Sequence, residues 1–421
     1  MFGDRQRPER VRSEQDRHLT RYLKRQVSPY STHYRPLIQQ ASAAGGKGRE
    51  LLARIPVTTL GDVDLPENLV LRPTDESIQI GGDPALALRV IWARLTGRVH
   101  HINRTHVEPS YKPVHWVLDD GIPVGSSVAD LDRLAELGRR WLESAGIGPT
   151  DILVGLVAPG PHLTYWQLVL GARRAGLSAL HLDGIPAPAD LERLRPTVIA
   201  GASADLLDLF EEAAREGRDL SSVHTLLVVG ELVTDETRAR LAGWLDRADG
   251  AVLTAWAPPG VRALWTECRG AIGLHTTPAA EVVETVDGEV VWSALGWSGT
   301  VLLRLRTGVE GVFDDSRCPA CGRSGVRILP TTGPRTLVPI LDRVVGTGRW
   351  QVEMRTVAGI DELIVYVAHD ARNDAAPVLQ ALVGELPPVT QFVLVPAKRI
   401  DARLAEYGGE NVLDGRVALT V

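Results

Sequence analysis

Apolar and polar residues follow two alternating patterns along residues 128–257. Short continuous apolar runs, typical of buried strands, occupy residues 151–158, 178–182, 197–201, 225–230 and 251–256. Between them lie segments with apolar residues at helical spacing, over 131–145, 162–175, 204–215 and 235–247, with a short helix beginning at Asp190. Buried strands that alternate with amphipathic helices are typical of βαβ units. The pattern therefore predicts an α/β fold with a largely parallel sheet covered on both faces.

The pattern changes after residue 257. Three β-rich runs separated by Gly and Asp turns occupy residues 281–286, 289–295 and 299–305. A Pro/Gly/Thr-rich stretch at 329–335 is typical of a hinge. Beyond it the sequence predicts a strand at 362–367, a helix at 376–386 and a strand at 391–395. We therefore expect a large domain over residues 1–330 and a small α+β domain over residues 331–421.

The first 120 residues are less regular. Residues 1–26 are rich in arginine with interspersed acids, and a Pro/Gly-punctuated region of weak periodicity follows them. The charged segment is either a solvated surface helix or an arm that binds a partner, and we interpret it as solvated surface.

Composition excludes several classes of function. The chain has 421 residues, 44% hydrophobic and 23% charged, with a net charge of −6. Nothing in this balance favours binding to nucleic acid or to an anionic membrane. The N-terminus lacks the apolar core of a signal peptide, and no apolar stretch approaches the roughly 18–20 residues that cross a bilayer. Three cysteines are consistent with a reducing compartment, so we expect a cytoplasmic protein.

The three cysteines are the strongest chemical signal. Cys318 and Cys321 form a C-x₂-C knuckle, and Cys268 begins a run that ends at His275. Three thiolates and one imidazole complete a tetrahedral zinc shell. The alternative is three reduced thiols that only happen to be close in sequence. A site with four protein ligands has no open position for water, so the zinc is expected to be structural.

Four further segments carry a resemblance. They are Ser28–Arg35, the Gly230-Glu231 strand end within 226–234, the Glu267–His275 run with Cys318 and Cys321, and the Arg-Thr-Gly run within 303–308. Over about residues 20–421 the chain resembles the adenylate-forming enzymes, and among them the phenylacetate-CoA ligase family. The resemblance implies a large domain with layered parallel sheets and a β-rich, zinc-stapled region, followed by a small mobile α+β domain.

The resemblance also implies an activity. Members of this family activate a carboxylic acid with ATP to an acyl-AMP and then pass the acyl group to coenzyme A. The chemistry needs a Gly/Ser/Thr-rich phosphate loop. The matching stretch, residues 116–127, keeps two serines but loses the threonine-glycine core and adds Asp119 and Asp120. We interpret this stretch as an ordinary turn that ends in a serine N-cap, with a phosphate loop as the alternative.

Three other ATP-handling positions depart from the family pattern. Val309 occupies the position of the family's acid that binds the ribose hydroxyls. The stretch 254–261 lacks the family's acid that binds Mg²⁺. Glu410 stands where a catalytic lysine stabilises the charge that develops during adenylation, and Lys398 follows a strand in an unrelated context. Removing such an electrostatic group commonly costs about 10²–10³ in rate.

A ligand site is still expected where parallel strands end. Residues 160–166 open a helix after a strand, a favourable place for an anion. The residues that we assign to nucleotide or substrate binding are Gly230, Glu231, Trp256, Arg306, Thr307, Gly308 and Arg335. The histidines at 100, 101, 106 and 115 lack metal-ligand spacing with nearby acids, and we interpret them as a polar loop.

Two functions therefore remain open. In the first, the chain is a degenerate homologue that no longer makes acyl-adenylates and instead binds a small carboxylic acid, an acyl group, a nucleotide or a protein partner. In the second, it is an active ATP-dependent acyl- or aryl-CoA ligase that uses ATP, Mg²⁺ and coenzyme A through relocated groups. The residue chemistry favours the first.

Overall fold

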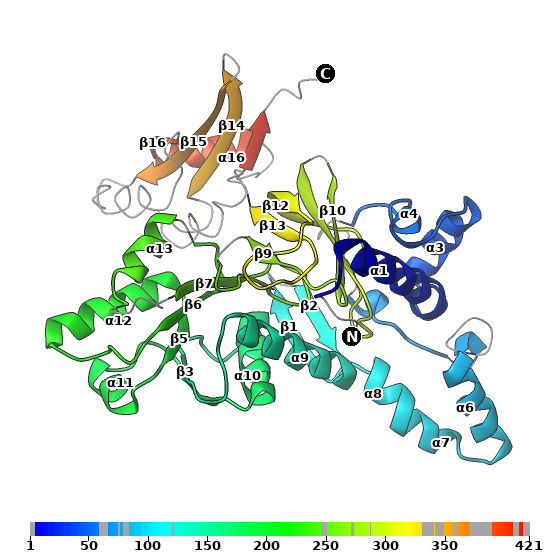
Figure 1. Ribbon diagram of the computed structural model, residues 1–421. Helices are drawn as coiled ribbons and strands as arrows, with labels where there is room; N and C mark the ends of the chain where they lie inside the picture. Colours follow the sequence, from blue (N-terminus) through cyan, green and yellow to red (C-terminus); the bar gives the residue numbers. More distant parts are fainter. Residues whose placement is uncertain are drawn as a thin grey trace. The chain divides into compact units, whose positions relative to one another are not determined.

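The computed structural model describes most of the chain. The described residues are 5–58, 66–74, 76–78, 84–119, 122–233, 235–245, 251–270, 273–286, 288–330, 341, 349–357, 360–369, 390–406 and 412–415. They divide into two compact units (Figure 1). The larger consists of residues 1–233, 240–307 and 311–329, and the smaller of residues 234–239, 308–310 and 330–421.

The larger unit begins with helices and continues as an α/β region. The first helices are α1 (Pro8–Tyr22), η1 (Leu23–Val27), α2 (Ser28–Tyr30), α3 (Tyr34–Ala43), α4 (Gly48–Leu52), η3 (Pro66–Leu69), α6 (Pro84–Leu95), α7 (Val99–Ile102), η4 (Asn103–Val107) and α8 (Glu108–Tyr111). The α/β region contains β1 (His115–Asp119), β2 (Ile122–Ser126), α9 (Val128–Ser144), β3 (Ile152–Gly155), α10 (Leu163–Ala175), β4 (Ser178–His181), α11 (Pro188–Leu194), β5 (Val198–Gly201), α12 (Ser203–Glu216), β6 (Thr225–Val229) and β7 (Ala251–Trp256). Helix α13 (Asp235–Ala242) lies between β6 and β7 in the chain, and its residues 235–239 belong to the smaller unit.

Short strands complete the sheet. They are β8 (Trp265–Thr266), β9 (Leu274–His275), β10 (Glu281–Val286), β11 (Glu289–Ala294), β12 (Leu305–Asp314) and β13 (Arg327–Pro330). One mixed sheet has the order β10-β11-β12-β13-β9-β8-β7-β6-β5-β3-β4. The strands from β4 to β7 run parallel, and β7 to β8, β8 to β9 and β9 to β13 are antiparallel. The predicted α/β fold class is confirmed. Parallel strands alternate with helices, and the same sheet continues directly into the β-rich region.

One predicted strand is wrong. The run 299–305 is not a strand along its length, and β12 begins only at Leu305. Arg304 has a left-handed φ of 52°, which interrupts the extended backbone. Its guanidinium donates to the carbonyls of Ala53 and Ile55 and pairs with Glu284. The apolar residues before Arg304 are buried as core rather than as part of a ladder, which the apolar pattern alone does not distinguish from a strand.

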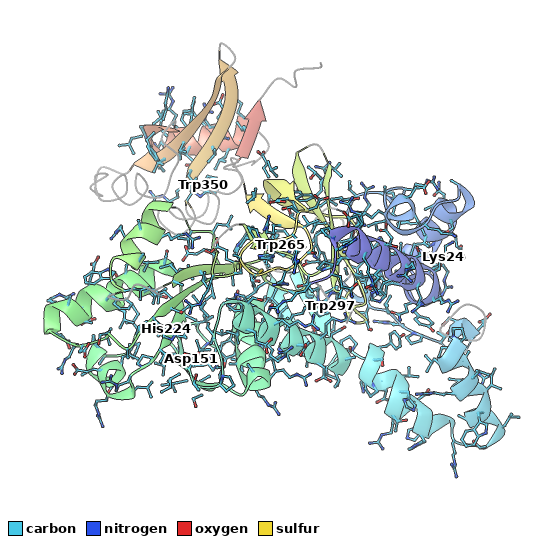
Figure 2. All side chains as sticks on the ribbon, viewed as in Figure 1. Lys24, Asp151, His224, Trp265, Trp297 and Trp350 are labelled. Atoms are coloured by element: carbon cyan, nitrogen blue, oxygen red, sulfur yellow. The ribbon has the colours of Figure 1, made fainter. Side chains whose placement is uncertain are left out.

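Tryptophans and a buried carboxylate organise the interior of the larger unit. Trp265 and Trp297 are fully buried (Figure 2). The Glu281 carboxylate accepts hydrogen bonds from the indole nitrogens of Trp265, at 3.0 Å, and Trp292, at 2.7 Å. Burial raises the pKa of Glu281. Both indole donors are thereby satisfied inside the core, as buried polar groups require.

The arginine-rich N-terminal segment is not simply solvated. In α1, Val11 and Leu19 are buried. The Gln15 amide donates to the carbonyls of Pro278 and Glu281, and the Tyr22 hydroxyl donates to the carbonyl of Trp297 at 2.6 Å. The solvated-surface interpretation is therefore wrong for one face of this helix, which packs against the end of the sheet.

The smaller unit is an α+β module. Its elements are β14 (Trp350–Val357), β15 (Ile360–His369), β16 (Thr390–Pro396), α16 (Ala397–Glu406) and β17 (Val412–Gly415), with the sheet order β16-β15-β14-β17. The predicted strands at 362–367 and 391–395 fall within β15 and β16. The predicted helix at 376–386 lies outside the described residues. In the described part of the chain, no helix is both long enough and apolar enough to span a membrane.

Two glycines set the distance between α9 and α10. A Cβ atom on Gly138 would lie 2.7 Å from the carbonyl oxygen of Gln167 and 2.7 Å from the Cα of Gly171. Real Cβ atoms do not approach backbone this closely, so the helices pack together only because both positions lack a side chain.

We expect Gly138→Ala to lower the free energy of unfolding by about 1–3 kcal/mol, because the helices must separate. Urea denaturation measures this change. Gly148→Ala is the matched control, since no atom lies within 4 Å of its added Cβ. Equal stability of the two variants would contradict the close helix contact.

Candidate functional site

The three cysteines and His275 come together at the β-rich end of the sheet. Cys268 follows β8, and His275 lies on β9. Cys318 and Cys321 lie in the turn between β12 and β13. Gly322 has a φ of 71°, the left-handed conformation that a knuckle turn needs. The four residues therefore bring β8 and β9 together with the connection between β12 and β13.

The spacing of the four side chains fits a tetrahedral metal. Their ligand atoms all lie within 4.8 Å of one another. The Sγ atoms of Cys268 and Cys318 are 3.8 Å apart, and Sγ of Cys321 lies 3.6 Å from Nε2 of His275. Zinc bonds of about 2.3 Å to sulfur and about 2.0–2.1 Å to nitrogen give tetrahedral edges of about 3.8 Å and about 3.6 Å. The residues present therefore fit zinc, and the fully protein-ligated site fits a structural ion.

The thiols lie close enough to shift one another's pKa values. The hydrogen bond with Cys321, followed by burial, raises the pKa of Cys268. The hydrogen bonds from Cys268 and His275 lower the pKa of Cys321. The Arg327 guanidinium, which is buried, donates to the carboxylate of Asp314 and to the hydroxyl of Ser316. A cation at the centre of the cluster would neutralise the negative charge of the buried thiolates, which is costly without a counter-charge.

We expect the purified protein to contain one zinc per chain by elemental mass spectrometry. His275→Ala should lose the metal and lower the free energy of unfolding by about 3–5 kcal/mol, because the strands lose their cross-link. His101→Ala is the control, since His101 is exposed and is not grouped with metal-ligating residues among those described. Retention of zinc by His275→Ala would contradict the assignment.

The stretch that matches the family's phosphate loop is a β-hairpin. Strands β1 and β2 pair antiparallel, with His115 opposite Ser126 and Asp119 opposite Ile122. Only Asp120 and Gly121 connect the two strands, and they lie outside the described residues. An Asp-Gly pair between paired strands is a strong hairpin signal in a sequence.

Both serines of this stretch are engaged inside the protein. Ser127 is the N-cap of α9: its hydroxyl accepts from the Asp130 backbone N–H, and the Asp130 carboxylate accepts from the Ser127 N–H. The Ser126 hydroxyl accepts from the Arg262 guanidinium at 2.9 Å. The interpretation as a turn that ends in a serine N-cap is therefore confirmed.

A buried ion pair lies beneath the hairpin. The side chains of Arg262 and Asp130 are 2% and 1% exposed, with 3.7 Å between the nearest nitrogen and oxygen. Arg262 also donates to the carbonyls of Gly125 and Thr300, and its guanidinium lies 4.7 Å from the centre of the Trp297 ring. The Asp130 carboxylate accepts the backbone N–H groups of residues 298 and 299. Nothing in the sequence analysis identified this pair, because its partners are far apart along the chain.

We expect Asp130→Ala to lower the free energy of unfolding by about 3–5 kcal/mol, because Arg262 would remain buried without its counter-charge. Asp132→Ala, on the same helix, is the control. The Asp132 side chain is 73% exposed and pairs only across the surface with Arg174, so we expect a loss below about 1 kcal/mol. Similar losses in the two variants, measured by urea denaturation, would contradict the role of the pair.

The Arg-Thr-Gly run lies on β12 and contacts its neighbouring strand. The Arg306 guanidinium pairs with Glu289 at 2.6 Å, and the Thr307 hydroxyl donates to the carbonyl of Val290 at 2.6 Å. Gly308 has a φ of 73°, and Val309 is buried. The side chains of Arg306 and Thr307 therefore both contact β11.

The other predicted site residues lie at the ends of β6 and β7. Gly230 has a φ of 86° and follows β6. The Glu231 carboxylate accepts the Ser203 N–H at 2.5 Å, at the first turn of α12. Trp256 ends β7 and meets Trp265 edge to face, with 6.0 Å between ring centres. Parallel pairing of β6 with β7 brings these residues to the same edge, as expected. Arg335 and Glu410 lie outside the described residues.

An acid that the sequence analysis did not consider lies beside Thr254. The Glu267 carboxylate accepts the Thr254 N–H at 2.8 Å, and the Glu267 N–H donates to the Thr254 carbonyl at 2.9 Å. Antiparallel pairing of β7 with β8 causes this approach. The stretch 254–261 has no acid of its own, but tertiary structure supplies one next to it.

Aromatic rings surround the first turn of α10. His115 meets Trp166 edge to face at 4.3 Å, and Tyr165 meets both Trp166 and His181. Burial lowers the pKa of His115 and of His181. Two imidazoles therefore lie among aromatic rings near this turn, His115 on β1 and His181 at the end of β4.

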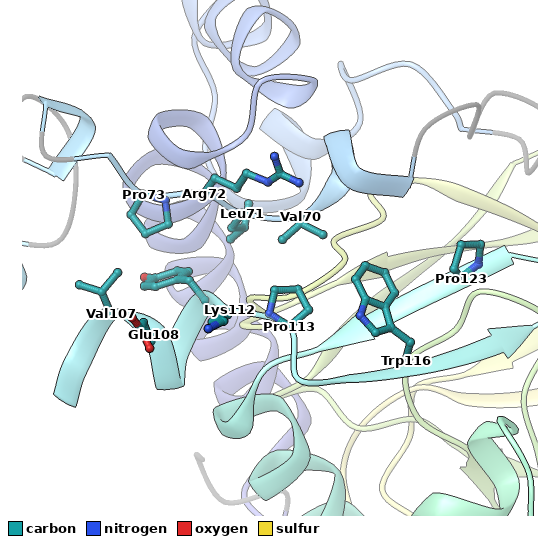
Figure 3. Close-up of a pocket in the computed structure, with 11 residues that line it drawn as sticks. Val70, Leu71, Arg72, Pro73, Val107, Glu108, Lys112, Pro113, Trp116 and Pro123 are labelled. Carbon is teal, nitrogen blue, oxygen red and sulfur yellow. The ribbon is translucent and has the colours of Figure 1, made fainter. Parts of the chain in front are cut away.

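A separate apolar pocket opens between the N-terminal segments and the hairpin (Figure 3). It has a volume of about 750 Å³. It is lined by Val70, Leu71, Arg72, Pro73, Val107, Glu108, Tyr111, Lys112, Pro113, Trp116 and Pro123. None of the predicted site residues lines it. The size is that of small-molecule sites, and the two basic side chains outnumber the single acid.

Comparison with known proteins gives the fold. No family model matches the chain, and no curated protein sequence matches it. The chain is similar to a crystal structure of 2-hydroxyisobutyryl-CoA ligase in complex with 2-HIB-AMP and CoA, with a TM-score of 0.57 and 16% identity over 97% of this chain and 89% of that one. It is also similar to the postadenylation state of that ligase, with a TM-score of 0.59 and 15% identity over 96% and 91% of the two chains. The chain therefore has the fold of the adenylate-forming acyl-CoA ligases.

Proposed function

We propose that this chain is a divergent homologue of the phenylacetate-CoA ligases that no longer forms acyl-adenylates and acts by binding. The observation that carries the proposal is the two-residue connection between β1 and β2. A phosphate loop holds its ligand with several successive backbone N–H groups and hydroxyls. A connection of two residues is too short to surround a triphosphate.

The surroundings of the hairpin support the same function. The hydroxyls of Ser126 and Ser127 are buried and bonded to Arg262 and to the Asp130 backbone. Val309, at the position of the ribose-binding acid, is buried and accepts no hydrogen bond from a ligand through its side chain. The proposal includes a structural zinc ion and domains of residues 1–330 and 331–421.

The ligand proposed for the binding function is a small carboxylic acid with an apolar body. The pocket of Figure 3 has an apolar lining that suits an aryl or alkyl group, and Arg72 and Lys112 supply positive charge at its wall. Carboxylate recognition by basic side chains is stronger where apolar walls exclude water. Gly230, Glu231 and Trp256 remain proposed ligand contacts at the sheet edge.

A second function rests on Glu267. An active ATP-dependent acyl- or aryl-CoA ligase needs an acid for Mg²⁺, and Glu267 is the acid that tertiary structure brings to Thr254. Its carboxylate is 7% exposed and already accepts a backbone N–H, so this function requires it to leave that contact.

Calorimetric titration of Mg-ATP into the zinc-loaded protein separates the two functions. We expect no binding at micromolar ATP and no acid-dependent exchange of pyrophosphate into ATP, because the phosphates have no loop to hold them. 2-Hydroxyisobutyryl-CoA ligase with its own acid is the positive control for both assays. Micromolar ATP binding with acyl-AMP formation from any carboxylic acid would overturn the proposal and favour the ligase.

A further inference from the structure

Helix α6 presents four large apolar side chains to solvent. They are Leu88, Ile91, Trp92 and Leu95, with exposed fractions of 68%, 45%, 56% and 82%. We call these four residues the α6 stripe. The opposite side of the same helix carries Val90 and Ala93, which are buried, and α6 contacts α7 (Figure 1). The helix thus has one apolar side used within the protein and a second that the described residues leave uncovered.

The α6 stripe has the geometry of a helix that binds another apolar surface. Its residues are spaced i, i+3, i+4 and i+7, the pattern of anchors in helix-in-groove recognition. With about 100° between successive residues, the four side chains lie within an arc of about 100°. A single continuous stripe of large apolar residues on a surface marks an interaction site, whereas scattered exposed residues do not.

Basic residues flank the α6 stripe on both sides. At about 100° per residue, Arg89 and Arg94 each lie about 60° beyond one edge of the stripe. Residues 84–108 contain four arginines and one acid, Glu108, a net charge of +3 in a chain whose total is −6. The segment is therefore locally opposite in charge to the protein that carries it, which favours an acidic partner.

We propose that the α6 stripe binds an amphipathic helix of a partner protein whose apolar face is bordered by Asp and Glu. Leu88, Trp92 and Leu95 contact the partner's apolar residues, and Arg89 and Arg94 face its acids, as flanking charges do in paired helices. A second copy of this chain is disfavoured, because two-fold pairing of α6 brings arginines against arginines. An anionic bilayer is disfavoured by the length of the stripe, which is only about 10 Å. The proposal is independent of the function proposed above.

Fluorescence anisotropy with a labelled synthetic peptide tests this proposal on the full chain. The peptide has three heptads with Leu at positions a and d and Glu at e and g, and its matched control carries Lys at e and g. We expect saturable binding of the acidic peptide, weaker at high salt, and no binding of the basic one. A double variant separates the α6 stripe from other exposed apolar surface. L88E/L95E should weaken binding by about tenfold or more, and Val312→Glu should not.

The control residue, Val312, is also an exposed apolar residue, at 58%, but lies on β12. All three substituted side chains are exposed, so we expect the variants to fold. Melting temperatures equal to that of the unsubstituted protein would show that they do.

Other outcomes would overturn the proposal. Equal binding of both peptides, or binding that L88E/L95E does not weaken, would show that the α6 stripe does not select an acidic helix. A dimer in light scattering that L88E/L95E dissociates would assign the stripe to a second copy. Sedimentation with phosphatidylcholine–phosphatidylserine vesicles, without peptide binding, would assign it to a membrane surface.

Discussion

The buried pair of Arg262 and Asp130 is the interaction on which the larger unit depends most. It links the β1–β2 hairpin, the first turn of α9 and the backbone of residues 298–300 through several hydrogen bonds. A buried charge is costly unless every one of its bonding positions finds a partner, so the surrounding backbone is held in one arrangement. The same arrangement engages the hydroxyl of Ser126 and both the N–H and the hydroxyl of Ser127. One interaction therefore orders the hairpin, the start of α9 and the two serines between them.

The Cys₃His cluster lies in the larger sheet, beside β8 and β9. It brings these two strands together with the loop between β12 and β13. Because β8 and β9 have two residues each, they gain little from their own ladder, and a metal bound by the cluster would add a cross-link to them. Arg327, which is buried, lies opposite His275 on the next strand, and Gly322 has a left-handed φ that glycine adopts without strain. The larger unit thus contains the four side chains of a possible metal cross-link.

Fold and chemistry are separate properties of a protein. The similarity to a ligase structure extends over 97% of the chain at 16% identity. A shared fold at that identity does not by itself define an activity, because activity resides in a few positioned groups. Here Arg306 and Thr307 contact a neighbouring strand, and Glu231 caps a helix. Residues that match a binding motif in sequence therefore also contribute to the scaffold.

Local patterns in the sequence were sufficient for the parallel sheet, its helices and the metal ligands. Apolar periodicity indicates which side of an element is buried, and the spacing of Cys318 and Cys321 indicates a knuckle. Both signals come from residues that are near one another in the chain. Tertiary structure decided three other features. They are the end of the 299–305 run, the packed face of α1 and the Arg262–Asp130 pair. Each depends on contacts between segments more than a hundred residues apart, for which a single sequence contains no local signal.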